Sequence, residues 1–351
     1  MLLLSIKVLE LSNYKEYRYT MEVSPFQSAL ESWAKIFEGK LTDNTIKFDN
    51  ALGKGTIKGF QCNEYIEVFC FKFHLKQKIT TSGKKLSEIA EFRPIFFGDP
   101  DGNKTLGIEQ DQDNELDEVT VENFPILTQG VFATNSKDSM TWDFNPNRDI
   151  HFISIRIKDS HFKELIKKSP NVEKIFSDEK SYYIFEEFDP IMHGMFWRIY
   201  TFKEDEVFLN ELVHACALHL LAVFFSKIHE REELLESNKY PINTKAVFMA
   251  RTILKKELNK QIHIDDLARE CGLSASRLRA LYKQVFGITI HQFHQNVRLD
   301  EARTLLRGGE KTMSMIAMDL GFSSASHFSA AFKKQFGYTP REFKDNLNIS
   351  R

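Results

Sequence analysis

Two stretches near the C-terminus place hydrogen-bonding and cationic side chains at helical spacing. In the first, Ser276, Arg279 and Lys283 share one face of a helix, with the small residue Ala280 beside them. In the second, the matching face carries Ser326, Ser329, Ala330 and Lys333. Hydroxyl and guanidinium groups can bond base edges, an ammonium group can bind phosphate, and small residues allow close approach. One such helix alone is more often a plain solvated face, but two in register favour recognition of a DNA major groove.

The two stretches are copies of one another. Ala268, Gly272 and Ser274 recur 49 residues later, and after a one-residue insertion six further identities recur 50 residues later. The identical pairs are Ala268/Ala317, Gly272/Gly321, Ser274/Ser323, Ala280/Ala330, Lys283/Lys333, Phe286/Phe336, Gly287/Gly337, Thr289/Thr339 and Phe293/Phe343. Agreement on this scale indicates a duplicated structural unit.

Each copy has the pattern of a helix-turn-helix. A short helix (264–271 or 313–320) is followed by a glycine, Gly272 or Gly321, which can end it in a left-handed conformation. A serine then caps the second helix, which we expect to be Ser274 in the first copy and Ser323 or Ser324 in the second. The residues expected to face the core are Leu278, Leu281, Tyr282 and Val285, and in the second copy Phe328, Ala331, Phe332 and Gln335. The apolar periodicity of 294–307 predicts a helix that joins the copies and holds their second helices about one DNA turn, roughly 34 Å, apart.

The charge distribution agrees with a polyanionic partner for this part of the chain. After residue 240 there are 18 Lys and Arg against 10 Asp and Glu, out of 47 and 49 in the whole chain. The first 240 residues therefore hold 29 basic and 39 acidic residues, which makes an acidic body joined to a basic C-terminal region.

The rest of the chain divides into a strand-rich and a helical part. β-branched and aromatic residues in 64–75 and 151–158 predict strands, the acidic stretch 99–118 an exposed loop, and 202–236 a long helix. Pro241 in 236–244 indicates a linker. Four cysteines without metal-like spacing are expected to be buried thiols. We therefore expect domains at 1–160, 161–238 and 239–351, the last with helix-turn-helix units at about 264–286 and 313–336 around the 294–307 helix.

The segment 298–343, RLDEARTLLRGG…MSMIAMDLGFSSASHFSAAFKKQFGYTPREF, resembles the signature of the AraC/XylS family of bacterial transcription regulators. The resemblance covers about 243–345. It implies an α+β multidomain protein, with an N-terminal cupin-like β-barrel and dimerisation helices ahead of an all-α domain of two helix-turn-helix units. It also implies a ligand-responsive activator that binds promoter DNA and contacts RNA polymerase, acts as a homodimer, and senses a small molecule whose identity the sequence does not give.

The resemblance places base contacts early on the second helix of each unit. Carried onto this chain, the base-contacting candidates are Ser276, Arg277, Arg279, Ala280, Ala325, Ser326, His327, Ser329 and Ala330. Because the second copy has only His327 as a long side chain there, we expect Arg279 to carry most direct readout. The phosphate-contacting candidates are Lys283, Lys333, Lys334 and Arg341. Arg298 and Arg303 have two competing roles. Each either packs against neighbouring helices or contacts DNA.

Three alternatives remain open at this stage. The first is an enzyme, a metal-binding cupin fused to a DNA-binding tail; we expect no catalytic residue, metal or cofactor, because His74 and His151 form no close pair and His214 and His219 share a helix face poorly. The second is a regulator whose N-terminal half binds a protein.

The third concerns an apolar stripe, which either forms a dimer or packs on its own barrel. Its residues are Leu209, Leu212, Val213, Cys216, Leu220 and Val223/Phe224. The stretch 212–225 is expected to be a buried helix rather than a membrane span, and without a recognisable signal peptide the protein is expected to be cytoplasmic.

Overall fold

The computed structural model divides the chain into two compact units, Met1–Glu233 and Leu234–Arg351. It describes residues 7–11, 14–21, 26–83, 91–99, 123–124, 130–135, 140–144, 146–147, 149–176, 182–231, 244–309 and 311–349. The predicted loop 99–118, apart from Asp99, and the predicted linker 236–244, apart from Thr244, lie outside these residues.

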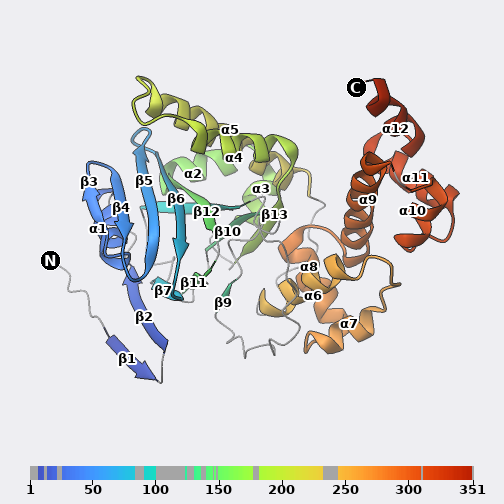
Figure 1. Cartoon of the computed structure of the whole chain (residues 1–351), viewed down its shortest axis with the longest axis horizontal. Coiled ribbons are helices and arrows are strands. Elements are labelled where there is room, and N and C mark those ends of the chain that lie inside the picture. The colour runs from blue at the N-terminus through green and yellow to red at the C-terminus, as the bar shows by residue number, and fades with distance from the viewer. Residues whose placement is uncertain are drawn as a thin grey trace. The chain divides into compact units, whose positions relative to one another are not determined.

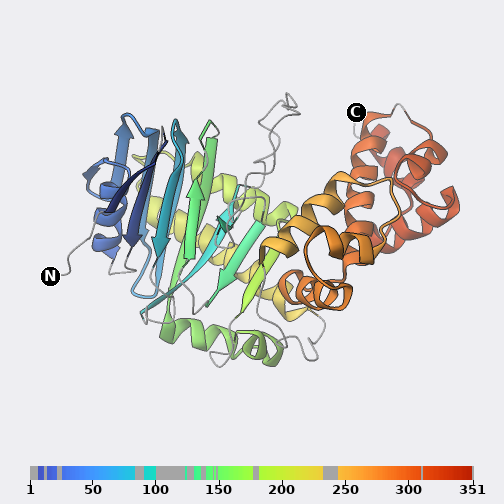
Figure 2. The ribbon, with the colours of Figure 1, turned by 90° about the horizontal axis from the view of Figure 1, so that it is seen from below.

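The first unit is built on an eight-stranded antiparallel sheet with the strand order β13-β10-β8-β12-β6-β5-β4-β3. Its strands are β3 (Lys40–Thr42), β4 (Thr45–Asp49), β5 (Gly53–Gln61), β6 (Ile66–Leu75), β8 (Phe92–Gly98), β10 (Gly130–Thr134), β12 (Asp149–Lys158) and β13 (Tyr183–Glu187). The strand predictions for 64–75 and 151–158 correspond to β6 and β12, which pair along their length. Figure 2 shows these strands side by side.

A second, five-stranded sheet has the order β1-β2-β7-β11-β9. Its strands are β1 (Lys7–Leu11), β2 (Tyr14–Met21), β7 (Ile79–Gly83), β9 (Asn123–Phe124) and β11 (Met140–Phe144). Among the described strands neither sheet closes, because β13 and β3 are the edges of one and β1 and β9 the edges of the other. The prediction of a closed cupin-like barrel is therefore not confirmed, although an antiparallel sheet domain is present. The β-branched and aromatic residues of these strands are expected in a barrel and in layered open sheets alike, so they do not distinguish the two.

Both faces of the eight-stranded sheet are covered, and eight of the ten residues of β6 are accordingly buried. One face, with Val68 and Cys70, packs against α2 (Asp159–Ile166), α3 (Pro170–Ile175), α4 (Pro190–Thr201) and α5 (Leu209–His229). The other face, with Phe69, Phe71 and Phe73, packs against α1 (Phe26–Ile36) and against Phe144 and Ile79 of the second sheet. Figure 1 shows α4 and α5 lying together over the sheet.

Helix α5 uses most of the apolar stripe predicted from the sequence to pack within its own unit. It has 21 residues and is by length and composition the one helix among the described residues that could cross a membrane. However, Val213, Cys216, Leu220 and Phe224 of the predicted stripe are buried in the core of their own unit. This supports a buried helix and removes those four side chains from any dimer interface.

The second unit is all helical. Its helices are α6 (Thr244–Lys256), α7 (Ile264–Glu270), α8 (Ala275–Phe286), α9 (Ile290–Gly308), α10 (Met313–Asp319), α11 (Ala325–Phe336) and α12 (Pro340–Ile349). In Figure 1, α9 runs from the group α6–α8 to the group α10–α12. This helix begins before the predicted range of 294–307, because Thr289 and Gln292 form a capping box that starts it at Ile290.

Candidate nucleic-acid interface

The two turns that precede the outward-facing helices share one backbone conformation. Gly272 ends α7 with a φ of 68°, and Gly321 ends α10 with a φ of 69°. Side chains with a Cβ rarely adopt this left-handed conformation, so glycine is the residue that allows the sharp change of direction into α8 and α11. The turns thus present α8 and α11 in the same way relative to α7 and α10.

A serine caps each of these helices. The Ser274 hydroxyl accepts from the Arg277 amide at 3.4 Å, and the Ser324 hydroxyl accepts from the His327 amide at 3.1 Å. The structure thereby distinguishes the two serines of the second copy: Ser324 is the cap, while Ser323 bonds the His327 ring. Satisfying a free amide at a helix start favours the helix over other local conformations.

The inward faces agree with the predicted pattern except at one position. Leu278, Leu281, Tyr282 and Val285 of α8 are buried, as are Phe328, Ala331 and Phe332 of α11. Gln335, predicted at the fourth inward position of α11, is exposed. The neighbouring Phe336 packs there instead, 4.6 Å from the Phe332 ring, because an apolar ring gains more from burial than an amide.

The outward face of α8 carries the first set of candidate side chains. Ser276 and Arg279 are exposed, whereas Arg277, Ala280 and Lys283 are partly buried. Arg279 is therefore the long cationic side chain of this set that projects most fully from the helix. Lys283, a predicted phosphate contact, lies in the last turn with part of its side chain covered.

The outward face of α11 is smaller and more polar. Ser326, His327 and Ala330 are exposed, and Ala325 and Ser329 are partly buried. The His327 ring is oriented by the Ser323 hydroxyl, 3.0 Å from Nδ1, and by an edge-on contact with Phe322 at 5.7 Å between ring centroids. This pairing was not predicted from the sequence, although the serine and histidine stand four residues apart. The arrangement leaves Nε2 as the nitrogen available to an external partner.

The remaining cationic candidates lie where α11 ends and α12 begins. Lys333 and Lys334 occupy the last turn of α11, Arg341 the first turn of α12, and all three are exposed. By contrast, Arg303 lies over the rings of Phe336 and Phe343, at 4.8 and 5.8 Å, and Arg298 bonds backbone carbonyls. Both arginines thus take the packing role that competed with DNA contact.

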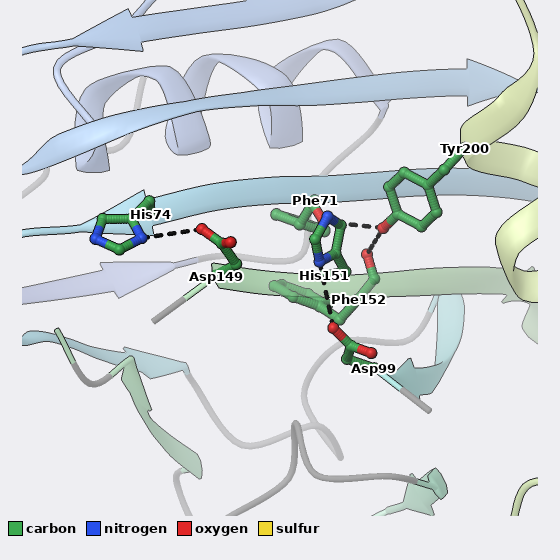
Figure 3. Close-up of polar contacts among 7 residues, drawn as sticks. All are labelled: Phe71, His74, Asp99, Asp149, His151, Phe152 and Tyr200. Atoms are coloured by element: carbon green, nitrogen blue, oxygen red, sulfur yellow. Dashed lines mark hydrogen bonds and ion pairs between the residues drawn. The ribbon is translucent and has the colours of Figure 1, made fainter. Parts of the chain in front are cut away.

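Polar contacts in the first unit bear on the enzyme alternative. His74 lies 2.9 Å from Asp149, and His151 lies 3.2 Å from Asp99, in separate pairs along β12 (Figure 3). The Tyr200 hydroxyl donates to the carbonyl oxygens of Phe71 and Phe152, and burial raises the Tyr200 pKa well above 10. Over the described part of the chain, no three His, Cys, Asp or Glu side chains gather where they could hold a metal ion.

The cysteines form no disulfide with one another. The described structure contains four free cysteines, of which Cys70, Cys216 and Cys271 are buried. Burial raises the pKa of Cys62 to about 12 and that of Cys271 to about 11, so both thiols are held in the neutral, unreactive form.

Comparison with known proteins finds a family model that matches within the second unit and relatives named as transcription regulators. A family model described as a helix-turn-helix domain matches residues 267–346. The chain is 34% identical over 94 residues to the HTH-type transcriptional activator RhaR of Mannheimia succiniciproducens, covering 27% of this chain and 34% of that protein. It is 27% identical over 132 residues to the HTH-type transcriptional regulator ArgR of Pseudomonas aeruginosa, covering 38% and 40%. These matches therefore span about a third to two fifths of the relatives' own length.

Comparison with solved structures also finds similar chains. A transcriptional regulator with an AraC-type DNA-binding domain from Chromobacterium violaceum is 30% identical, covering 29% of this chain and 91% of that chain with a TM-score of 0.28.

Proposed function

We propose that this protein, whose C-terminal unit is a helix-turn-helix domain of the AraC type, is a sequence-specific DNA-binding regulator of transcription. The observation that carries the proposal is the repeated unit itself. Two helices, α8 and α11, follow equivalent glycine turns and serine caps, bury equivalent faces, and expose hydrogen-bonding side chains on the opposite face. Proteins use helices presented in this way to read the major groove.

The two helices divide the recognition between them. Arg279 of α8 can make a bidentate contact with a guanine, which is worth about 1–3 kcal/mol of discrimination. We propose that Ser276, Arg277 and Ala280 complete this contact surface. On α11 the base-contacting set is Ala325, Ser326, His327, Ser329 and Ala330. Its small residues suit close approach and contact with thymine methyl groups, and His327 adds one directed hydrogen bond.

Phosphate contacts add affinity that does not depend on sequence. Lys333, Lys334 and Arg341 project from neighbouring turns of α11 and α12, where they can bind the backbone beside the groove that α11 enters. Lys283 has the equivalent position on α8. Each neutralised phosphate releases counterions, so binding weakens as salt rises.

We propose that the first unit is the regulatory part. Its double-sheet fold, covered by α2–α5, would bind a small-molecule effector, and the effector would shift the population of DNA-binding-competent molecules. The named relatives include a transcriptional activator, which favours activation over repression. We propose that activation proceeds through contact with RNA polymerase in the cytoplasm. The alternative proposal is that this unit binds a protein instead of a small molecule.

The outward face of α5 suits a homodimer. Phe208, the residue before α5, is 67% exposed, and Leu218 on α5 is 44% exposed. Ala215 and Ala222, one turn before and one turn after Leu218, are also exposed. This stripe differs from the one expected from sequence, most of which is buried in the same unit. Apolar surface of this kind is stabilised when a second copy covers it.

An enzyme is the less supported candidate. The relatives are named as transcriptional regulators or activators, and the histidine–carboxylate pairs of the first unit are separate and involve one histidine each. We therefore propose a regulator rather than an enzyme.

Selection of genomic DNA fragments by the purified full-length protein at one fixed salt concentration tests the proposal. We expect a discrete motif that extends over about two helical turns. Enrichment of fragments without any common motif would contradict sequence-specific regulation.

A further inference from the structure

The two helix-turn-helix units are joined at a second place besides α9. The segment 257–260 follows α6 and is called here the brace segment. It contacts the second helix-turn-helix, which consists of α10 and α11. Its Leu258 side chain packs on the apolar core formed by α9, α10 and α11. Because the segment continues directly from α6, it links the first helix-turn-helix to the second without passing through α9.

Two side chains of α9 hold the brace segment by its backbone. His294 Nε2 lies 3.1 Å from the Glu257 carbonyl oxygen, and Arg298 donates from Nε to the Leu258 carbonyl and from Nη2 to the Lys260 carbonyl, both at 2.6 Å. These carbonyls follow the end of α6, where backbone oxygens lack intrahelical partners and carry partial negative charge. A guanidinium group can bond two of them in one fixed geometry, which a lysine ammonium cannot.

Gly321 closes the contact from the other side. A Cβ atom on Gly321 would lie 2.7 Å from the Asn259 carbonyl oxygen and 3.1 Å from Arg298 Nη2. The equivalent Gly272 of the first copy has nearly the same φ, yet a Cβ there would meet no described atom within 4 Å. The absence of a side chain at Gly321 is thus required twice, for the turn and for the brace segment, whereas at Gly272 it is required for the turn alone.

From this contact we infer that the brace segment, held by His294 and Arg298 against Gly321, fixes the spacing and relative rotation of α8 and α11. The inference rests on the proposed function and adds how that function obtains its specificity. Two linked binding modules gain affinity from each other only when their geometry allows both to engage at once. A single connecting helix can bend and twist, but a second attachment removes that freedom, so His294, Arg298 and Gly321 are positioning residues for a site of fixed length.

The test uses the full-length protein and the duplex that wild type selects from a random-sequence pool. Each variant is titrated against this duplex, against versions with one of the two segments scrambled, and against a version with one base pair inserted between them. The inserted base pair separates the segments by about 3.4 Å and rotates them by roughly a tenth of a turn. We expect the affinity of wild type to fall about tenfold or more when the base pair is inserted, and this ratio of affinities is called the insertion penalty.

The variants are Arg298→Lys and Gly321→Ala, with Gly272→Ala and Gln295→Ala as matched controls. Gly272→Ala imposes the same backbone strain without the contact, and Gln295 is an exposed residue of the same helix. We expect Arg298→Lys and Gly321→Ala to bind the intact duplex about tenfold more weakly, to bind the scrambled duplexes like wild type, and to lose most of the insertion penalty. The controls keep the wild-type penalty.

The insertion penalty is a ratio within one protein sample, so partial unfolding of a variant does not change it. A wild-type penalty in both Arg298→Lys and Gly321→Ala would overturn the inference. An equal loss on intact and scrambled duplexes would also overturn it, since it would show that these residues serve folding alone. If wild type selects no two-segment duplex, the proposed function itself fails.

Discussion

At the scale of single residues, the proposed function gives different roles to side chains in the middle and in the last turn of a recognition helix. Arg279 projects from the middle of α8, and Lys334 projects from the last turn of α11. We expect Arg279→Ala to cost about 1–3 kcal/mol of binding and to relax the preference at one position of the site. Lys334→Ala should weaken binding to all sequences alike and reduce the slope of affinity against salt by about one. Titrations of both variants at several salt concentrations distinguish the two roles, and interchanged phenotypes would contradict the assignment.

We expect the stability of the second unit to depend on pH through His294. Its burial, and next the charge of Arg298, lower the His294 pKa below 6.5, while the bond to the Glu257 carbonyl acts in the opposite direction. The unfolded chain therefore takes up this proton more readily than the folded chain, so stability is complete above about 6.5 and falls as pH decreases toward the folded pKa. We expect hydrogen exchange of α9 to speed up more between pH 7.5 and 5.5 in wild type than in His294→Gln, after correction for intrinsic rates. Equal acceleration in the two proteins would show that His294 is not responsible.

Sequence reasoning reached some of these residues and missed others for a definite reason. Ser276, Arg279 and Ser326 could be predicted because helical periodicity fixes which face a residue occupies. His294 and the pairing of Ser323 with His327 were missed, because their partners are set by tertiary contacts or by a choice between adjacent serines. Gln335 was misplaced because strict periodicity ignores the larger gain from burying the neighbouring Phe336.

At the scale of elements, the adjacent serines before α11 have different structural tasks. Ser324 caps the helix, whereas Ser323 orients the His327 ring. We expect Ser324→Ala to destabilise the start of α11 by about 1 kcal/mol, and Ser323→Ala to change it by only a few tenths. Hydrogen exchange of the α11 amides measures the difference directly, with about fivefold loss of protection for Ser324→Ala alone. Equal protection in both variants would contradict the assignment of the cap.

Elements differ in how far sequence determines them. The turn glycines, capping serines and inward apolar residues of the helix-turn-helix units are local signals, which is why the second helix of each unit could be placed from sequence. The closure of the sheets depends instead on which strands become neighbours across long sequence separations. Strand β6 shows the limit, because its apolar residues on both faces fit a barrel and layered open sheets equally well.

At the scale of the whole molecule, the proposed dimer depends on the exposed apolar face of α5. Leu218 is an exposed apolar residue on the outward face of α5. Leu218→Glu would bury a carboxylate in the proposed interface, so we expect the dimer dissociation constant to rise about tenfold or more. Met318→Glu is the matched control, because Met318 of α10 is 73% exposed and belongs to the other unit. Sedimentation of both variants over a concentration series measures the change, and a monomeric wild type would refute dimerisation.

The central claim, that one chain reads two adjacent major-groove segments with α8 and α11, is tested most directly by a hydroxyl-radical footprint. The full-length wild-type protein would be bound to the duplex it selects. The account predicts protected patches about one helical turn apart on the same side of the duplex, and loss of only one of them in Arg279→Ala. Protection confined to one patch, or uniform protection unchanged by the substitution, would contradict it.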